Sequence, residues 1–485
     1  MDHFFTSTDR VRKYWEPIPG VDLDAVAYVT RAGALPDGTP FFLDEVMRPA
    51  EPLSSFFRSE AKTLEASSLR DYTYDLLDVL DFLAGLETPA DLLSATEDDL
   101  VAFRDDRTQY QEVPVSPATW RRRRVAINNF YTWAVDTRVL EERPYLRRKS
   151  GRDVLAWGSV SQLDVRHLTF DQWRCFKDVG LRGLLPGGGA DPAFRGRDPL
   201  RNSSAGELAI TTGMRLREFS SLLDIEVGPP RRDGSARLVD LETIAKYQLP
   251  RTVEVQDATL RELDLYRRTE RAGAVRRSSR ALARRREDFF VVDDIDTARM
   301  KLRGTLHGRR RTFTVKLMDA PLRRITMREG DHGLEPMALF VGRHGQMLGR
   351  QRWDQVFDVA QARCTAVIAA HDLPLEMPRT IRIHDLRHTF AIFMLELLTQ
   401  IVLEQAAKEI HEGGRTPAYL GEHLSRNAFL RVQQLLGHRR AESTMRYLRY
   451  IRRTNLLVAQ AIRTWNDQDT TFADYAAREA GKVAA

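Results

Sequence analysis

The chain has 485 residues, 42% of them hydrophobic and 29% charged, which is typical of a globular protein with two or three domains. Its two cysteines, Cys175 and Cys364, exclude a disulfide framework and a cysteine-rich zinc site, and they fit a reducing cytosol. The formal net charge is +6, and blocks of arginine favour a polyanionic partner. We expect neither a signal peptide nor a membrane span, because Asp2 opens the N-terminus and the most apolar stretch, 390–407, contains charged residues.

The N-terminal third is predicted to be an arm followed by a helical domain. Five prolines lie within the first 50 residues, so residues 1–53 are interpreted as an arm or cap. From 54 to 148, apolar residues recur at helical spacing, first over 72–83 and then over 98–109. A third helix is predicted to begin at Ser116-Pro117, because proline is favoured at the first position of a helix.

The third helix carries four consecutive arginines, which point in several directions around a helix. Some of them must therefore face solvent or a phosphate backbone. A solvated helix face is the alternative to DNA contact. The residues for which we predict DNA contacts are Arg121, Arg122, Arg123, Arg124 and, further on, Arg251. A polar, basic stretch then predicts a linker over 149–166.

The rest of the chain combines helices with a small sheet. Helices are predicted around Arg215 and over 353–369, and a small sheet over 236–255. The arginine-rich stretch 268–330 fits either a DNA-touching element or a solvated helix. These patterns predict a mainly α-helical protein with a small β-sheet, which is an α+β fold.

Two boxes near the C-terminus carry side chains suited to phosphate chemistry. The first, Ile-His-Asp-Leu-Arg-His-Thr-Phe-Ala, places His384 and Arg387 three residues apart, so a helix would present both to one anion. The second follows a predicted helix stop at Gly437 with His438 and then offers the hydroxyl of Tyr447. Imidazole, guanidinium and phenol groups without a metal-ligand pattern are what metal-free chemistry on a phosphodiester would need.

Two upstream stretches complete this set of side chains. The sequence Thr-Gly-Met-Arg-Leu-Arg-Glu joins two apolar segments and contains Arg215 and Glu218. Lys246 precedes a turn at Pro250 and the alternating stretch 251–255, which predicts a lysine on a β-hairpin.

In the order and spacing of these residues, the chain resembles the tyrosine recombinases, or phage-type integrases, from Ser54 to Trp465. Their pattern is an arginine in a Thr-Gly-(apolar)-Arg segment, a hairpin lysine, His-x-x-Arg, Leu-Gly-His, and a tyrosine nine residues after that histidine. The matching positions are Arg215, Lys246, His384, Arg387, His438 and Tyr447, with Glu218 in support. The resemblance implies a helical core DNA-binding domain and a catalytic domain that form a C-shaped clamp around DNA.

The resemblance also implies a division of the chain into domains. The parts are 1–53, an arm or cap; 54–148, a SAM-like core-binding domain; 149–166, a linker; 167–465, the catalytic domain; and 466–485, a C-terminal tail. Compact relatives lack the stretches 268–330 and 398–428, which are therefore interpreted as insertions. Such insertions leave the boxes intact because long loops add little to the entropy of loop closure.

The matching side chains have expected roles in the chemistry that the resemblance implies. Arg215, Arg387 and His438 would bind the non-bridging oxygens of a phosphodiester, where the transition state gathers charge. Tyr447 would attack the phosphorus and form a covalent 3′-phosphotyrosyl link. Lys246 would protonate the leaving 5′ oxygen.

Two further residues are expected to support this chemistry. His384 would orient the cluster or accept the tyrosine proton, and Glu218 would hold the Arg215 region in place. Neither a cofactor nor a metal is implied. The expected partners are double-stranded DNA and further copies of the chain, as a tetramer on paired sites, in the cytoplasm at the nucleoid.

Several alternatives stay open at the level of sequence. Tyr450 is the alternative nucleophile, and Lys316 is the alternative lysine. His388 is adjacent to Arg387 on the predicted helix, so we expect it to point elsewhere and to be structural. The leading function is a site-specific recombinase or integrase of a mobile genetic element. The alternatives are a type IB topoisomerase-like relaxation of DNA and a DNA-binding protein without catalysis.

Overall fold

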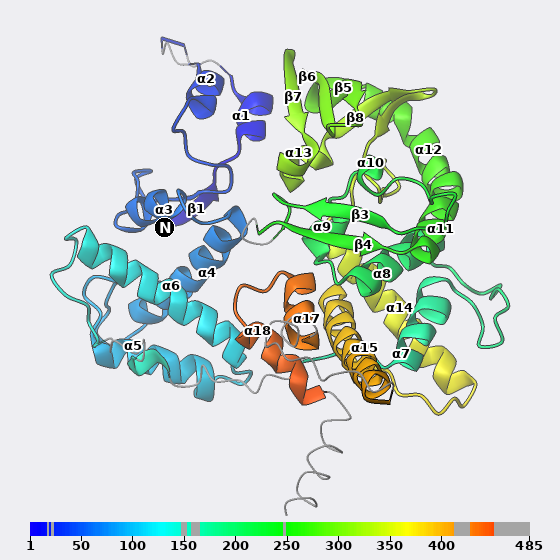
Figure 1. The fold of residues 1–485 in the computed structure, drawn as a ribbon. Helices are drawn as coiled ribbons and strands as arrows, with labels where there is room; N and C mark the ends of the chain where they lie inside the picture. The colour runs from blue at the N-terminus through cyan, green and yellow to red at the C-terminus, as the bar shows by residue number, and fades with distance from the viewer. Residues whose placement is uncertain are drawn as a thin grey trace, which may run out of the picture. The chain divides into compact units, whose positions relative to one another are not determined.

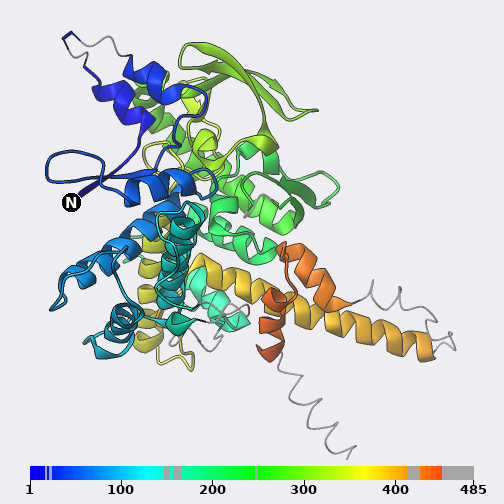
Figure 2. The same ribbon diagram turned by 90° about the vertical axis from the view of Figure 1, so that its left-hand side faces the viewer.

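The computed structural model describes residues 1–16, 19–20, 24–146, 153–156, 165–245, 249–411 and 427–450. The chain divides into two compact units, Met1–Leu163 (unit 1) and Asp164–Ala485 (unit 2), drawn in Figure 1 and, from a second side, in Figure 2. Most of the predicted linker, residues 412–426 of the second predicted insertion and the predicted tail lie outside the described residues. Among the helices of the described ranges, none combines the length and apolar character that crossing a membrane requires.

Unit 1 consists of helices and a short two-stranded sheet. Its elements are β1 (Asp2–Phe5), α1 (Thr8–Tyr14), α2 (Ala25–Thr30), β2 (Pro40–Leu43), α3 (Leu53–Glu60), α4 (Ala66–Ala84), α5 (Glu97–Asp105), η1 (Asp106–Tyr110), α6 (Pro117–Asp136) and η2 (Val154–Ala156). β1 and β2 pair antiparallel, with Asp2 opposite Leu43. Phe42 is buried and its ring centroid lies 5.4 Å from that of Phe57 in α3. Through Phe42, β2 therefore shares the hydrophobic core of the helices.

The three helices predicted in this region are present as α4, α5 and α6. α6 begins at Pro117 as expected, and the hydroxyl of Ser116 accepts a hydrogen bond from the backbone N–H of Thr119 (3.1 Å). In the first turn of α6, the buried indole of Trp120 donates to the carbonyl of Leu155 (2.9 Å). This bond satisfies the one polar group that the indole brings into the core.

Unit 2 contains helices around a two-stranded sheet, followed in sequence by a five-stranded sheet. Its helical elements are α7 (Phe170–Cys175), η3 (Phe176–Leu181), α8 (Pro199–Thr212), α9 (Leu216–Ser220), α10 (Asp224–Val227), α11 (Asp257–Tyr266), η5 (Arg267–Arg271), α12 (Ala272–Ala283), η6 (Arg286–Asp288), η7 (Val315–Leu317), α13 (Ala320–Arg324), α14 (Arg350–Ala370), α15 (Ile383–His411), α17 (Ala428–Leu436), α18 (Glu442–Met445) and η8 (Arg446–Tyr450). Its strands are β3 (Arg237–Leu241), β4 (Arg251–Val255), β5 (Phe290–Asp296), β6 (Lys301–Leu306), β7 (Arg309–Thr314), β8 (Thr326–Gly330) and β9 (Gly333–Pro336).

The main core of unit 2 lies between the β3–β4 hairpin and the helices around it. Buried side chains from η3, α8, β3, β4, α11, α14 and the start of α15 form one hydrophobic cluster. β3 and β4 pair antiparallel, with Leu241 opposite Arg251, where the sequence predicted a small sheet. α14 likewise covers the predicted helix over 353–369.

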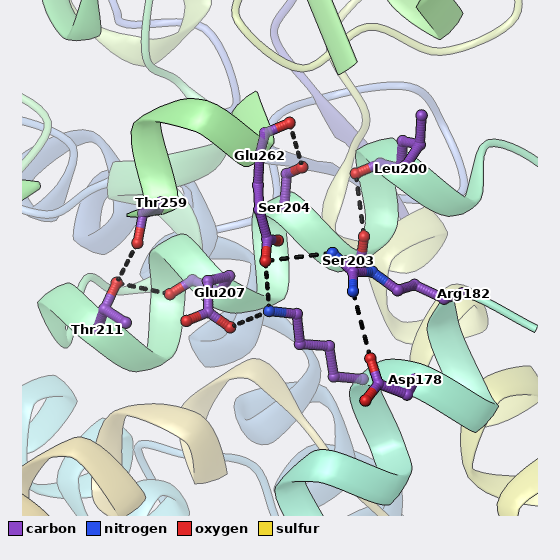
Figure 3. A network of polar contacts seen from close by, with 10 residues as sticks. Asp178, Arg182, Leu200, Ser203, Ser204, Glu207, Thr211, Thr259 and Glu262 are labelled. Carbon is purple, nitrogen blue, oxygen red and sulfur yellow. Dashed lines mark hydrogen bonds and ion pairs between the residues drawn. The ribbon is translucent and has the colours of Figure 1, made fainter. Parts of the chain in front are cut away.

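A network of charged side chains ties η3 to α8 and α11 (Figure 3). The Nζ of Lys177 lies 2.8 Å from Glu207 of α8 and 2.6 Å from Glu262 of α11. Arg182 reaches the same carboxylate of Glu262 at 3.1 Å. All four side chains are less than one third exposed, so these pairs are less screened than surface ion pairs. They fix α8, whose C-terminal end at Gly213 leads into the candidate site.

The arginine-rich stretch 268–330 is not simply a solvated helix, because it contains α12 and α13 and also contributes four strands to a five-stranded sheet. The strand order is β7-β6-β5-β8-β9, with only the β5–β8 pair parallel. On one face, Val291 packs with Leu282 of α12. Phe290 and Leu302 pack with Leu223 in a second cluster. Together with the helices, these sheets confirm the predicted α+β fold.

Candidate active site

Two glycines end helices where two of the predicted site residues begin. Gly213 ends α8 with φ of +61°, and Gly437 ends α17 with φ of +60°. This left-handed backbone favours glycine. A Cβ on Gly213 would also lie 2.4 Å from the ring of Phe390. The tight turns direct the chain to Arg215 two residues after the first glycine and to His438 directly after the second.

Glu218 is a fully buried carboxylate that holds two guanidiniums. It accepts hydrogen bonds from the backbone N–H of Arg215 (2.7 Å) and from its Nη1 (3.0 Å), in the first turn of α9. Arg251, at the start of β4, donates from Nη1 (3.0 Å) and Nη2 (2.6 Å) to the two carboxylate oxygens. This paired geometry is the strong form of an arginine–carboxylate contact. Glu218 therefore links α9 to the β3–β4 hairpin.

Arg387 is buried in α15 and donates to the ends of two other helices. Its Nη1 donates to the carbonyl of Gly213, and its Nη2 donates to the carbonyl of Leu436, both at 2.5 Å. Arg251 donates to the same Leu436 carbonyl at 3.3 Å. C-terminal carbonyls of helices lack intrahelical partners and carry partial negative charge, so they suit a cation. Burial, together with the charges of Arg215 and Arg251, lowers the pKa of Arg387 to about 9.

Tyr447 lies in η8 with its hydroxyl against the imidazole of His388. The hydroxyl is 2.9 Å from Nδ1 of His388. Tyr447 is buried, with 2% of its surface exposed. The ring of His438 stacks beside Tyr447, with centroids 6.2 Å apart and an interplanar angle of 14°. Burial raises the pKa of the Tyr447 hydroxyl, and the charge of Arg387 opposes this shift.

Both imidazoles beside Tyr447 are neutral at physiological pH. Burial lowers the pKa of His388 to about 3 and that of His438 to about 3, and nearby positive charges, including Arg387, act in the same direction. Nδ1 of His438 is 2.8 Å from the hydroxyl of buried Thr444. This bond fixes the ring and leaves Nε2 as its other polar atom.

The structure brings most of the predicted site residues together in unit 2. Arg215 and Arg387 are linked through the contacts of Glu218, Arg251 and the two helix ends, and His438 and Tyr447 stack beside them. His384 lies one turn before His388 on α15, is exposed, and has its ring centroid 4.3 Å from that of His388. Lys246 lies outside the described residues, as does the side chain of Tyr450. The alternative lysine, Lys316, is 54% exposed and pairs with Glu242 at 3.2 Å.

Two contributors to this site were not predicted as such. The expectation that His388 points elsewhere is wrong, because its ring meets the hydroxyl of Tyr447. The sequence held a signal for this contact, since His388 follows His384 by four residues and lies on the same helix face. Arg251 was predicted to contact DNA. It is buried instead, with its side chain 5% exposed and paired with Glu218.

The arginine block of α6 is largely paired within unit 1. Arg122 lies 3.0 Å from buried Asp75, and Arg123 pairs with Asp78. Arg124 donates twice to Asp153, at 2.8 and 2.9 Å. Arg121 is exposed. Contact of these four arginines with DNA stays a prediction.

The arrangement in unit 2 suits the binding of an anion beside a nucleophile. Three guanidiniums, a neutral imidazole and a phenol converge there. In the described ranges, no cluster of three or more histidine, cysteine, aspartate or glutamate side chains could hold a metal ion. Guanidinium groups match the geometry of phosphate oxygens. A phenol in such a field is a nucleophile once its proton is removed.

Comparison with known proteins identifies one part of the chain directly. Residues 58–138 match the family model of the phage integrase N-terminal SAM-like domain, so this segment belongs to that family and the predicted resemblance to phage-type integrases is confirmed. A comparison with curated proteins finds no match.

Several solved structures are distantly similar to the chain. XerH site-specific recombinase bound to palindromic difH substrate is 13% identical, with 85% of each chain covered and a TM-score of 0.44. The Tn1549 transposon integrase in complex with transposon right end DNA is 11% identical, with 81% of this chain and 92% of that chain covered and a TM-score of 0.43. XerA recombinase is 13% identical, with 81% and 91% covered and a TM-score of 0.28.

Replacing Glu218 with glutamine is expected to lower the free energy of unfolding by about 3–5 kcal/mol, because two guanidiniums lose their buried counter-charge. Urea unfolding followed by circular dichroism measures the loss. Glu226→Gln is the matched control, since the Glu226 side chain is 6% exposed and pairs with a single guanidinium outside the site, that of Arg323, so its loss should be smaller. A Glu218→Gln protein as stable as the wild type would contradict the role given to this carboxylate.

The two buried imidazoles should make the chain sensitive to acid. Their folded pKa values of about 3 lie below the unfolded value of about 6.5, so the unfolded state binds more protons in this window. The stability that they contribute is complete above about pH 6.5 and is lost progressively as the pH falls toward 3, by up to about 1.4 kcal/mol per pH unit for each histidine.

Urea unfolding between pH 7.5 and 4 tests this expectation. His388→Gln and His438→Gln should each make the unfolding free energy less dependent on pH. In each variant, the slope should fall by the equivalent of about one bound proton. Met214→Leu, a buried substitution without an ionisable group, should change stability equally at every pH. Histidine variants that keep the wild-type slope would show that these imidazoles do not stay neutral in the fold.

Proposed function

We propose that this chain, which carries a phage integrase N-terminal SAM-like domain over residues 58–138, is a site-specific DNA recombinase. It would cleave and rejoin DNA through a covalent 3′-phosphotyrosyl intermediate, and its proposed setting is the integration of a mobile genetic element. The observation that carries this proposal is the buried hydroxyl of Tyr447, held beside neutral imidazoles in the same site as Arg215 and Arg387. The proposed partners are duplex DNA and further copies of the chain on paired sites.

The proposed role of the guanidiniums is to bind the phosphate under attack. A phosphodiester repels nucleophiles because it is charged, and its transition state spreads more charge over the non-bridging oxygens. Arg215 and Arg387 would donate to these oxygens, since each guanidinium has five N–H groups and Arg387 uses two of its donors on helix carbonyls. Arg251 and Glu218 would hold Arg215 in position without touching the substrate.

His438 would add a hydrogen bond to a non-bridging oxygen. The hydroxyl of Thr444 lies against Nδ1, so in the tautomer with hydrogen on Nε2 the threonine donates to Nδ1 and Nε2–H is left to donate. The low pKa of His438 does not oppose this role, because a neutral imidazole still has one N–H donor. A bound phosphate would raise the pKa of both imidazoles, since an anion offsets the arginine charges that lower them.

The covalent step would begin at the Tyr447 hydroxyl. Its proton would pass to Nδ1 of His388, 2.9 Å away, while the phenolic oxygen forms a bond to phosphorus and the bond to the 5′ oxygen breaks. The leaving 5′ oxygen would take a proton from Lys246, the family's hairpin lysine. The new phosphotyrosyl bond conserves the energy of the broken one, so a 5′-hydroxyl from a second duplex reverses the step without ATP.

The burial of these groups implies a rearrangement when DNA binds. Tyr447 is 2% exposed and Arg387 is 1% exposed, so a phosphate in duplex DNA cannot reach both in the DNA-free arrangement. Tyr447 belongs to the short η8 element that follows α18, and its contacts to α15 are side-chain contacts. We expect η8 to shift when DNA binds, far enough to admit the phosphate beside Arg215 and Arg387, while the Tyr447 hydroxyl keeps its contact with His388.

Tyr447→Phe should abolish covalent attachment to DNA, with a loss of more than about 100-fold, because the attacking oxygen is absent. The full chain is incubated with a library of nicked duplexes, denatured in detergent, and the attached DNA is quantified and sequenced. Tyr450→Phe is the matched control and should form the adduct at the wild-type level.

An undiminished adduct from Tyr447→Phe, or its loss only in Tyr450→Phe, would overturn the assignment of the nucleophile. Paired duplexes carrying the recovered sequence then separate recombination from relaxation. Strand exchange between the two duplexes is expected, whereas relaxation of supercoils without exchange would favour a topoisomerase-like activity.

His388→Phe should slow adduct formation by about 10- to 100-fold, because the tyrosine loses its proton acceptor. The rate of the variant should also rise more steeply with pH than that of the wild type, since the phenol must then ionise unaided. The side-chain oxygen of His388→Gln accepts a hydrogen bond, so this variant should recover part of the rate by holding the Tyr447 hydroxyl in place. It should not recover the weaker pH dependence of the wild type. Single-turnover rates on the nicked substrate measure both effects.

His371→Phe is the control for this experiment, because His371 is exposed at the C-terminal end of α14. Its rate and pH profile should match those of the wild type. A His388→Phe enzyme that is slower but keeps the wild-type pH profile would leave His388 a packing role only.

A further inference from the structure

The positive charge of the chain is concentrated in one part of unit 2. The segment from α12 to β9, residues 272–336, is named here the sheet module. It contains 16 arginine and lysine residues against nine aspartate and glutamate residues, a formal charge of +7, whereas the whole chain carries +6. The remaining 420 residues are therefore close to neutral. A charge gathered in this way is the electrostatic footprint of a polyanion site.

Much of this charge lies on one exposed β-hairpin. β6 and β7 pair antiparallel from Lys301 opposite Thr314 to Leu306 opposite Arg309, and β7 is the edge of the sheet. His307 and Gly308 form the two-residue turn with φ of +49° and +73°, the left-handed backbone of a type I′ turn. This turn matches the twist of the strands, so the hairpin projects as a regular ribbon.

Arginines occupy both faces of the ribbon near its tip. Side chains alternate along a strand, so Arg309 and Arg311 share one face and Arg310 lies on the other. All three are exposed. Arg303 of β6 is opposite Thr312 and therefore shares the face of Arg310. Among the described residues, no carboxylate is paired with Arg309 or Arg311.

The pairs on the second face are weak enough to be exchanged. Arg310 pairs with Asp293, and Arg303 lies 2.7 Å from Asp294. All four side chains are 45% exposed or more, and exposed ion pairs contribute little to stability. Phosphate groups can therefore replace these carboxylates at small cost.

We propose that the β6–β7 hairpin is a second contact of this chain with duplex DNA, outside the active site. A two-stranded antiparallel ribbon fits the major groove of B-form DNA, and arginines on both faces reach the phosphates on either side of the groove. The proposal rests on the proposed function only in taking DNA as the substrate. Figure 1 shows the sheet of β5–β8 at one end of unit 2 and α17 and α18 at the other, beyond β3 and β4. The hairpin would therefore bind a stretch of duplex separate from the cleaved phosphate.

An edge strand rich in arginine has one other physical use. Charges on an edge discourage pairing with the edge of another molecule. That use predicts aggregation after the arginines are removed and no change in DNA affinity. The two accounts are therefore separated by measuring affinity and association state together.

The test compares the wild type with Arg309→Gln/Arg311→Gln on labelled mixed-sequence duplexes of about 20 and about 60 base pairs, over a series of salt concentrations. On the longer duplex the variant should bind about tenfold more weakly, and the slope of log affinity against log salt should be smaller by about 1.8, because two phosphate contacts are lost. On the shorter duplex, which spans less of the protein, the difference should be smaller.

Arg261→Gln/Arg268→Gln is the matched control, because it removes two arginines that are 70% and 77% exposed on or next to α11. It changes the net charge equally and should leave the salt slope near that of the wild type. Arg309→Lys/Arg311→Lys keeps both charges and should restore most of the affinity. Sedimentation of each protein shows whether it remains in the same association state.

Equal affinity and salt slope for the hairpin variant and the wild type would overturn this inference, whether or not the variant aggregates. Equal losses from the hairpin and control variants would also overturn it, because the effect would then be one of net charge. These results leave the proposed function intact, since adduct formation by Tyr447 is measured separately. A wild-type protein that binds neither duplex would instead remove the proposed function itself.

Discussion

The candidate site depends on the burial of positive charges against one carboxylate and two helix ends. Arg215 and Arg251 meet at Glu218, and Arg251 and Arg387 meet at the carbonyl of Leu436. Guanidiniums so close to one another repel, and burial removes the water that would screen them. The fold compensates with acceptors whose positions are fixed by glycine turns. The C-terminal carbonyls of α8 and α17 are left without intrahelical partners, so the arginines satisfy the helix ends while the helix ends hold the arginines.

This balance leaves a surplus of positive charge that affects each neighbouring group. Burial and this surplus together keep His388 and His438 neutral, with pKa values of about 3, and the surplus opposes the effect of burial on the Tyr447 hydroxyl. A surplus of positive charge destabilises the site when no anion is bound, and it stabilises an anion that binds there. The same electrostatics thus account for the uncharged tyrosine and the two uncharged imidazoles beside the arginines, and they are the reason why we propose a phosphate as the ligand of this site.

The sequence predicted which described residues meet in the candidate site because these residues lie in short boxes with fixed spacing. Gly437 predicted a helix end, and the start of α6 at Pro117 followed from the preference of proline for the first helical position. The prediction for His388 was wrong because it compared this residue with its neighbour Arg387. His388 follows His384 by four residues, and this spacing places the two histidines on the same face of α15. Arg251 was assigned to DNA because its partner Glu218 lies 33 residues earlier in the chain. A contact of that kind depends on how β4 packs against α9, which local spacing does not determine.

The five-stranded sheet shows the same limit on a larger scale. Its β5 strand pairs in parallel with β8 and antiparallel with β6, and such pairing depends on the fold of the whole segment. The segment also lies between two elements of the site, since β4 carries Arg251 and α15 carries Arg387. A long segment between β4 and α15 would separate Arg251 from Arg387 if only the intervening chain fixed their relative positions. They are held instead through the carbonyl of Leu436, which lies far from both in sequence and accepts from both. Because this contact does not depend on the length of the chain between β4 and α15, the site can keep its geometry while the sheet module lies between them and carries the binding surface that we propose for it.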